Sequence, residues 1–306
     1  MRSFLTVLSA LALFALTAPD ASACACGCGV FSVGTSALLP NGAGATAFLE
    51  YDYMNQSQNW SGSSSAPAAN NADKDIRTDF YTAGLQYMFD RDWGLMAEIP
   101  YWDRLFVTTL DDGSIGGFHH SALGDIRLRG VYTGFSDDMS TGIIFGLKLP
   151  TGDYTYPNFD RDTSIGSGST DSILGVYHES ALDADNTWTW FAQGQWERAF
   201  KSRDGYRPGN ELDAAAGVYY GGWQLGAQST LAPVLQLLAS DRWRDSGPLA
   251  STAGSGYQRL LAAPGLEFDT GKLRLYADVE LPLYQDVNGN QLVAPRLYKF
   301  IVAYSF

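Results

Sequence analysis

The sequence predicts an all-β protein, an antiparallel up-and-down transmembrane β-barrel of about twelve strands. Three observations predict this fold. The chain starts with an export signal, apolar and polar residues alternate with a period of two through most of the remainder, and short connections alternate with long ones. An outer-membrane barrel combines all three features.

The N-terminus has the three parts of a secretory signal peptide. Arg2 supplies a basic start, residues 4–16 form an apolar run, and Ala-Ser-Ala at 21–23 is a cleavage site of the A-x-A type. We therefore expect residues 1–23 to be a cleaved signal peptide. The apolar run is too short to span a bilayer as a helix, and no later stretch reaches about 18 apolar residues. We expect an exported chain that has no transmembrane helix.

Residues 24–42 are expected to form a periplasmic segment, and this segment holds the three cysteines of the chain. The oxidising compartment favours a disulfide or a redox-labile cluster, although an odd number leaves one sulfur over. A lipid anchor on the first cysteine and a soft-metal site for Cu(I) or Zn(II) are the two alternatives. No other cofactor is expected. The metal or disulfide candidates are Cys24, Cys26 and Cys28.

Residues 43–306 are expected to form the barrel itself. Twelve alternating segments can be placed, each long enough for a tilted strand of about 9–11 residues. They lie at roughly 43–54, 77–89, 92–107, 121–135, 140–150, 171–180, 187–199, 210–220, 222–239, 256–268, 271–283 and 293–306.

The connections support a membrane barrel over a soluble β-sandwich or barrel, which alternation alone does not exclude. Connections after the even-numbered segments are tight and those after the odd-numbered ones are mostly longer and polar, as at 55–76 and 151–170. Asn288-Gly289 is expected to be a tight hairpin turn. Aromatic residues near strand ends also favour the membrane: Tyr51, Tyr53, Trp93, Tyr101, Trp188 and Trp223.

The last strand resembles the assembly signal of bacterial outer-membrane proteins, which typically end in Phe. Three internal stretches, "SALGDIRLRGVY" (121–132), "GIIFGLKLPTGDY" (142–154) and "GSGSTDSILGVY" (166–177), resemble the outer-membrane family named for the MetA pathway of phenol degradation. Members are commonly labelled transporters. The resemblance implies passage of small molecules, with hydrophobic or aromatic compounds as candidates, but transfers no binding residue. The terminal face that carries the assembly signal is Tyr298, Phe300, Val302, Tyr304 and Phe306.

These resemblances lead us to expect a protein of the Gram-negative outer membrane. Its expected partners are outer-membrane lipid and lipopolysaccharide, the barrel-assembly machinery and a small-molecule solute. The formal net charge of −13 argues against a nucleic-acid partner.

Charged residues in the strands are expected to face the interior, because an Arg or Lys at mid-bilayer would cost about 2–4 kcal/mol. They would line a porin-like pore and select solutes. Alternatively, acids and bases pair across the lumen and fill it, and both can hold in a selective channel. The pore-lining candidates are Glu50, Asp52, Glu98, Arg104, Asp125, Arg127, Arg129, Lys148, Asp213, Glu267, Arg274, Asp278, Glu280 and Lys299.

No catalytic residues are expected. His119-His120-Ser121 could suggest a hydrolase, but adjacent histidines on an extended chain point to opposite faces, and an activated nucleophile needs an oriented base. The sequence therefore predicts an outer-membrane channel or transporter rather than an enzyme. The alternative is a structural or interaction barrel whose cysteine segment binds a soft metal or a redox partner in the periplasm.

Overall fold

The computed structural model describes residues 30–31, 34, 38–40, 42–221, 223–226 and 229–306. The expected signal peptide and all three cysteines lie outside these residues. No helix in the described part of the chain is long and apolar enough to cross a membrane.

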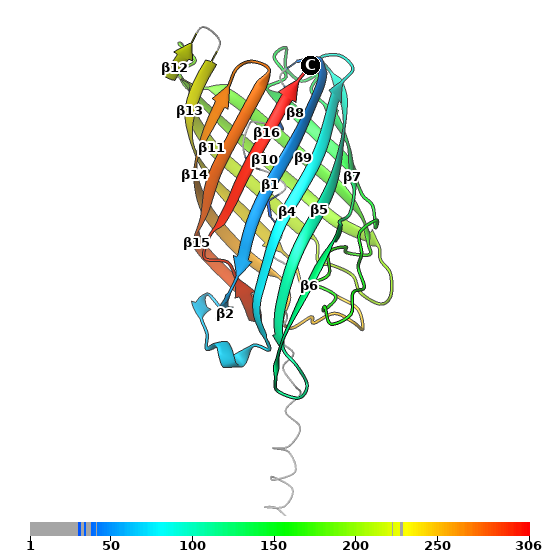
Figure 1. Cartoon of the computed structure of the whole chain (residues 1–306). Helices are drawn as coiled ribbons and strands as arrows, with labels where there is room; N and C mark the ends of the chain where they lie inside the picture. Colours follow the sequence, from blue (N-terminus) through cyan, green and yellow to red (C-terminus); the bar gives the residue numbers. More distant parts are fainter. Residues whose placement is uncertain (1–29, 32–33, 35–37, 41, 222, 227–228) are drawn as a thin grey trace, which may run out of the picture.

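Twelve antiparallel strands form a closed barrel, as the sequence predicted (Figure 1). Each strand pairs with its two neighbours along the wall, and the first pairs with the last to close the ring. In order around the wall these strands are β1 (Gly44–Gln56), β4 (Asp73–Met88), β5 (Trp93–Thr109), β7 (Arg127–Tyr132), β8 (Thr141–Lys148), β9 (Thr170–Ala181), β10 (Trp188–Lys201), β11 (Glu211–Tyr220), β13 (Ser229–Arg242), β14 (Tyr257–Asp269), β15 (Leu273–Val293) and β16 (Leu297–Ser305).

Four short strands and a turn of 3₁₀ helix decorate this wall. The connection after β1 contains β2 (Gln58–Gly62), β3 (Ser64–Ser65) and η2 (Ala68–Asn70), and β2 pairs with the far end of β15. The strand β6 (Ile115–Leu123) extends the wall by pairing with the second half of β5, and β12 (Trp223–Gly226) pairs with β13. We call the end that holds the C-terminus the inner end and the opposite end, with the longer loops, the outer end.

Three local predictions were wrong. The single strand expected at 222–239 is two strands, because β12 folds back and pairs with the start of β13. The segment expected at 121–135 is broken after Leu123, because the intervening residues turn to hydrogen-bond a neighbouring loop: Ile126 N donates to Thr151 Oγ1 at 2.9 Å. Asn288-Gly289 is not a hairpin turn. It lies inside β15, where the register against β2 shifts and Gly289 has a φ of 67°, so the dipeptide forms a bulge.

The exterior of the barrel is apolar. Tyr298, Phe300 and Tyr304 on β16 are exposed, as is Phe306 directly after it, whereas Lys299 on the same strand is buried. Exposed apolar side chains of this kind occur on strands all around the wall, which is far more than a soluble monomer tolerates.

Aromatic residues bound this apolar surface at two levels. Pairs eight positions apart on one strand, such as Trp93 with Tyr101 and Trp188 with Trp196, are exposed on the outside. Eight residues span about 26 Å along a strand, or about 20 Å of height for a strand tilted by about 40°, which is most of an apolar band about 25 Å tall. The two aromatic levels therefore flank an apolar surface of the height expected between the two interfaces of an outer membrane.

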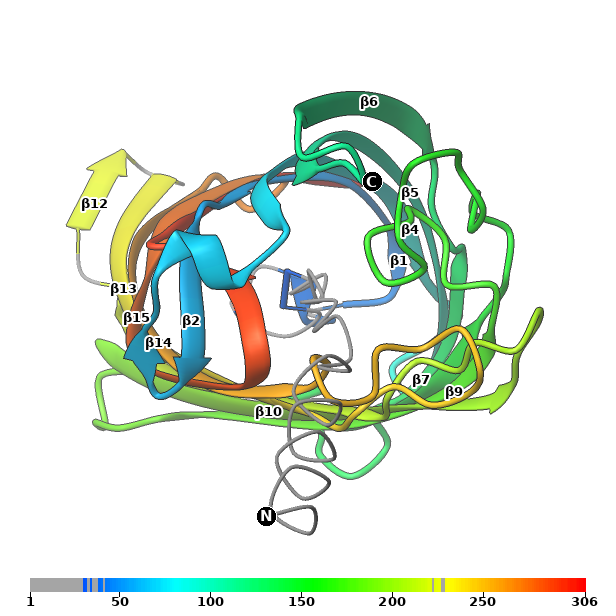
Figure 2. The ribbon, with the colours of Figure 1, turned by 90° about the horizontal axis from the view of Figure 1, so that it is seen from below.

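The interior is packed rather than open. A cluster of buried side chains from β1, β4, β10, β11 and β13 to β16 meets in the lumen, and it includes Phe31 from the N-terminal segment. Seen along the axis, described N-terminal residues lie inside the ring of strands (Figure 2).

Leu49 tests the orientation of the wall. It is 50% exposed and lies opposite Val302, midway between the two aromatic levels. Leu49→Arg should lower the free energy of unfolding by about 2–4 kcal/mol, because the charge would face hydrocarbon. Denaturant unfolding of the protein in lipid vesicles measures this change. Asp185→Arg, in an exposed turn at the inner end, is the matched control, and equal losses in the two variants would contradict the assigned orientation.

Candidate functional site

Thirteen of the fourteen charged residues predicted to face inward lie on wall strands with their side chains inward, and Asp125 lies in the connection between β6 and β7. Glu50, Arg127 and Arg274 are partly buried. The other eleven are no more than 9% exposed: Asp52, Glu98, Arg104, Asp125, Arg129, Lys148, Asp213, Glu267, Asp278, Glu280 and Lys299. Their role in selecting a solute stays a prediction.

Most of these charges pair along the wall rather than across the lumen. Lys299 Nζ lies 3.1 Å from Asp52 Oδ1 on the neighbouring strand, and Arg129 Nη1 lies 3.1 Å from Glu98 Oε1 on another neighbouring pair. The alternative expectation of pairing across the lumen is therefore wrong, and the physical reason is register. Asp52 and Lys299 occupy directly opposed positions of adjacent strands.

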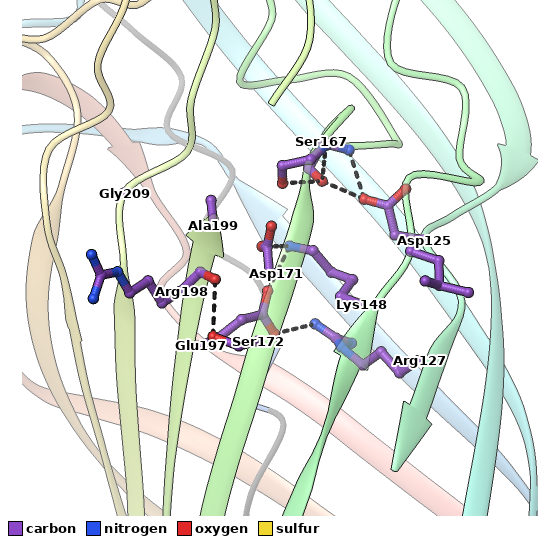
Figure 3. Close-up of polar contacts among 12 residues, drawn as sticks. Asp125, Arg127, Lys148, Ser167, Asp171, Ser172, Glu197, Arg198, Ala199 and Gly209 are labelled. Carbon is purple, nitrogen blue, oxygen red and sulfur yellow. Dashed lines mark hydrogen bonds and ion pairs between the residues drawn. The ribbon is translucent and has the colours of Figure 1, made fainter. Parts of the chain in front are cut away.

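The longest of these networks crosses β7 to β10 (Figure 3). Arg127, Lys148 and Asp171 occupy opposed positions on three successive strands. Lys148 Nζ lies 2.6 Å from Asp171 Oδ2 and also contacts Glu197, whose other oxygen is 3.3 Å from Arg127 Nη2. Each buried charge in this network has an opposite partner, which offsets its desolvation.

Asp125 ties the loop at 149–169 to the wall (Figure 3). Its Oδ1 accepts a hydrogen bond from Gly152 N at 2.9 Å, and its Oδ2 accepts from Ser167 N at 2.9 Å and from the Ser167 hydroxyl. The three stretches that carry the family resemblance, separate in sequence, thus meet at one carboxylate. Asp125, Gly152 and Ser167 together are called the Asp125 latch below.

Small residues make this close approach possible. A Cβ on Gly166 would lie 2.4 Å from the carbonyl carbon of Gly152, and a Cβ on Gly152 would lie 2.8 Å from the carbonyl carbon of Gly124. Any side chain at Gly152 or Gly166 would therefore push the loop away from the wall.

Two arginines hold the part of the loop that reaches into the barrel. Arg104 on β5 donates from Nη1 to Thr163 O at 2.5 Å and from Nε to Thr78 Oγ1 at 2.8 Å. Arg161, in the loop itself, donates to the carbonyl oxygens of Tyr154 and Ser167. The loop is thereby fixed as a cover over the outer half of the lumen.

Between the described residues, the lumen contains an outer and an inner cavity. The outer one, about 150 Å³, lies between the loop at 149–169 and the wall, and the inner one, about 90 Å³, lies toward the inner end. Val30 and Trp102 line both cavities. Described N-terminal residues therefore stand between the two cavities.

The N-terminal segment expected in the periplasm enters the barrel in its described residues. Arg259 stacks over the ring of Phe31 at 4.3 Å, and Lys299 Nζ donates to Phe31 O at 3.4 Å. Closer to the inner end, Gln86 Nε2 donates to Leu38 O at 3.5 Å. Apolar side chains in this segment find a buried environment in the lumen that the periplasm would not supply.

The histidine pair is split between two faces. His119 contacts Asp103, and its side chain is 61% exposed. The ring of His120 points the other way, lies 3.0 Å from Asp153 Oδ2 and stacks on Tyr156. Among the described residues, no group of three or more His, Cys, Asp or Glu side chains could hold a metal ion.

The sequence pattern did not predict a cluster of charged and polar side chains at the outer cavity, which consists of Asp162, Tyr206, Arg242 and Asp245. Asp162 faces Asp245 and Arg242, and Tyr206 donates from its hydroxyl to Asp245 Oδ2 at 2.7 Å. Burial, followed by repulsion from Asp245, raises the pKa of Asp162 to about 7. Asp162, Tyr206 and Asp245 lie in irregular loops, where no periodic pattern could have marked them, and Arg242 is the last residue of β13.

The closed wall, the apolar exterior and the charged lumen define a transmembrane β-barrel of the outer-membrane type. The crystal structure of the COG4313 outer membrane channel from Pseudomonas putida F1 has a TM-score of 0.65 at 14% identity, covering 90% of this chain and 100% of that one. The β domain of the Bordetella autotransporter BrkA has a TM-score of 0.51 at 14% identity, covering 86% and 100%. No family model and no curated protein matches the chain. At these identities the likeness shows the fold alone.

Removing the carboxylate of the Asp125 latch should free the loop. Hydrogen bonds to a charged group contribute about 1.5–3 kcal/mol each, so Asp125→Ala should speed trypsin cleavage after Arg161 at least tenfold in vesicles. Densitometry of the fragments measures the rate. Asp112→Ala is the control, because among the described residues the Asp112 carboxylate bonds to Ser114 within its own exposed turn. Equal cleavage rates in the two variants would contradict the role of the latch.

Asp162 should make the loop cover sensitive to pH. Its pKa in the folded protein, about 7, lies above the usual value of 3.8, so the folded state favours the protonated form. The stability from Asp162 is therefore full below about pH 4 and is lost as the pH rises through 7. The melting temperature of the wild type minus that of Asp162→Asn should fall as the pH rises from about 4 to about 7 and should level off above pH 8. Calorimetry measures this difference, and a flat difference would contradict the assignment.

Proposed function

We propose that this protein is an outer-membrane channel for small molecules. The observation that carries the proposal is a closed barrel, apolar outside, with two cavities in its lumen and described N-terminal residues between them. A structural barrel has no need of such cavities beside a charged inner wall. The proposal includes localisation in the outer membrane after export, with terminal-strand recognition by the barrel-assembly machinery.

The N-terminal residues are the gate in this proposal. Val30 and Phe31 occupy the lumen between the cavities, so a solute passes only when they move aside. The paired charges of the wall remain in place and present a fixed polar surface to the solute.

The proposed solute is a small molecule, with hydrophobic or aromatic compounds as candidates. Support comes from the three stretches at 121–132, 142–154 and 166–177, which resemble the family named for the MetA pathway of phenol degradation. The similar structure described as a COG4313 outer membrane channel supports transport in general. No step of covalent chemistry is proposed.

The cysteines carry the second candidate function, that of a barrel whose N-terminal segment binds a soft metal or a redox partner. Because Cys24, Cys26 and Cys28 lie outside the described residues, this hypothesis stays a prediction from the sequence. The mass of the mature N-terminal peptide distinguishes a disulfide, a lipid and a bound metal. Replacing the three cysteines by Ser should leave solute flux unchanged if the channel proposal alone is right.

Trimming the gate should open the channel. Phe31 is 2% exposed and lies in the luminal cluster, so Phe31→Ala should raise the single-channel conductance at least severalfold. Planar-bilayer recording of purified protein measures it. Phe89→Ala, which removes a ring facing lipid (57% exposed), is the matched control. Absence of conductance in the wild type and in both variants would overturn the channel proposal.

A further inference from the structure

The outer cavity contains two cations that lack a protein counter-ion. Arg104 is 2% exposed, and it bonds to Thr78 and to the backbone of Thr163. Arg161 bonds only to the carbonyl oxygens of Tyr154 and Ser167, and its Nε is buried without a partner. Neither guanidinium forms an ion pair with a carboxylate among the residues that the structure describes. Both line the cavity of about 150 Å³.

Other cations around this cavity are already neutralised. Arg127 and Lys148 pair with Glu197, and Arg242 pairs with Asp245 at 2.9 Å. Arg104 and Arg161 therefore differ from their neighbours in having unused donors beside a space. Guanidinium donors form a planar fork that matches a carboxylate.

Acidic residues also line the cavity, and they would repel an anion unless they were paired or protonated. Asp125, Asp171 and Glu197 are engaged by the latch and the wall network. Glu211 accepts hydrogen bonds from the hydroxyls of Ser240 and Tyr257, and Asp162 and Asp213 remain on the lining. A carboxylate in a poor environment can take up a proton, and the pKa of Asp162, raised to about 7, shows this adjustment. An arginine has no such escape, because it stays protonated in proteins. Arg104 and Arg161 therefore stay charged beside the cavity and can accept an anion as partner.

The remaining lining favours an anion with an apolar body. Arg104 lies over the ring of Trp102 at 5.1 Å, and Arg161 lies over the ring of Tyr206 at 4.8 Å. Trp102, Tyr206, Pro100 and Ile165 all contribute to the lining. A cavity of about 150 Å³ holds a molecule of the size of benzene.

We propose that the outer cavity is a binding site for a small organic monocarboxylate with an aromatic or similarly compact apolar body. Its carboxylate accepts hydrogen bonds from Arg104 and Arg161, and its apolar body lies against Trp102 and Tyr206. The site deepens the proposed channel function by naming a class of solute that pauses beneath the loop at 149–169.

Calorimetric titration of the full-length protein in detergent micelles, at about pH 6, tests the site with three probes of one shape: benzoate, benzamide and benzylamine. Titration into protein-free micelles gives the blank. Benzoate should bind at least tenfold more tightly than the neutral or the cationic probe. Equal affinity for benzoate and benzamide, or no binding of benzoate, would overturn the proposal.

Variants locate the binding. Arg104→Gln should weaken benzoate binding at least tenfold, whereas Arg104→Lys, which keeps the positive charge, should lose less. Arg244→Gln, an exposed outer-loop arginine that does not line the cavity, should leave the affinity within about twofold. The heat-dependent shift in gel mobility reports whether each barrel is folded. If Arg104→Gln does not fold, Arg161→Gln takes its place with the same expected loss. Undiminished binding in a folded Arg104→Gln variant would overturn the assignment.

Conductance of the same preparations keeps this proposal separate from the channel proposal. Selective benzoate binding without conductance would overturn the channel and leave the site standing. Conductance without selective binding of benzoate would overturn the proposed carboxylate site and leave the channel proposal standing.

Discussion

The pairing of β1 with β16 is the interaction on which the rest of the structure depends. Hydrocarbon offers no hydrogen-bonding partner to the edge of a sheet, so strands persist in a bilayer only in a closed ring. The first and last strands meet in continuous register from Thr46 opposite Ser305 to Met54 opposite Leu297. Once the ring is closed, each wall residue faces either lipid or lumen. Leu49 thus faces hydrocarbon, while its neighbour Glu50 faces the interior.

Closure concentrates charge in a narrow lumen, and strand register then decides which charges meet. Lys299 lies opposite Asp52 on one neighbouring strand and opposite Asp278 on the other. An ion pair buried in this way offsets much of the desolvation of both partners. Since these pairs lie flat along the wall, the axis of the barrel is left to the N-terminal residues and the inward loop. Arg104 and Arg161 differ from the other luminal cations, because the wall strands provide neither of them with a carboxylate partner.

The sequence predicted the barrel and the inward faces well because the face of a strand residue is a local property. A period of two is enough to assign Asp52, Lys148 and Lys299 to one side. Ion-pair partners depend on register between distant segments, which a local pattern does not contain, so pairing along the wall was not foreseen. The prediction of a hairpin turn at Asn288-Gly289 was wrong because a β-bulge and a hairpin turn both use a glycine with positive φ. No alternation marks Phe31 or Arg161, and only the folded barrel brings them to the lumen.

Two obstructions fill the lumen, and they are held with different strength. The loop at 149–169 is fixed by the Asp125 carboxylate through backbone donors at 2.9 Å and by the buried guanidinium of Arg104. Phe31 and Leu38 are held by longer polar contacts of 3.4–3.5 Å. What retains the N-terminal residues is mainly the burial of apolar side chains, about 1.5–3 kcal/mol for one large side chain. A solute with an apolar surface can replace that burial, whereas it cannot replace the hydrogen bonds of the latch. In the proposed channel, displacement of the described N-terminal residues, with the loop left in place, is therefore the opening that requires less free energy.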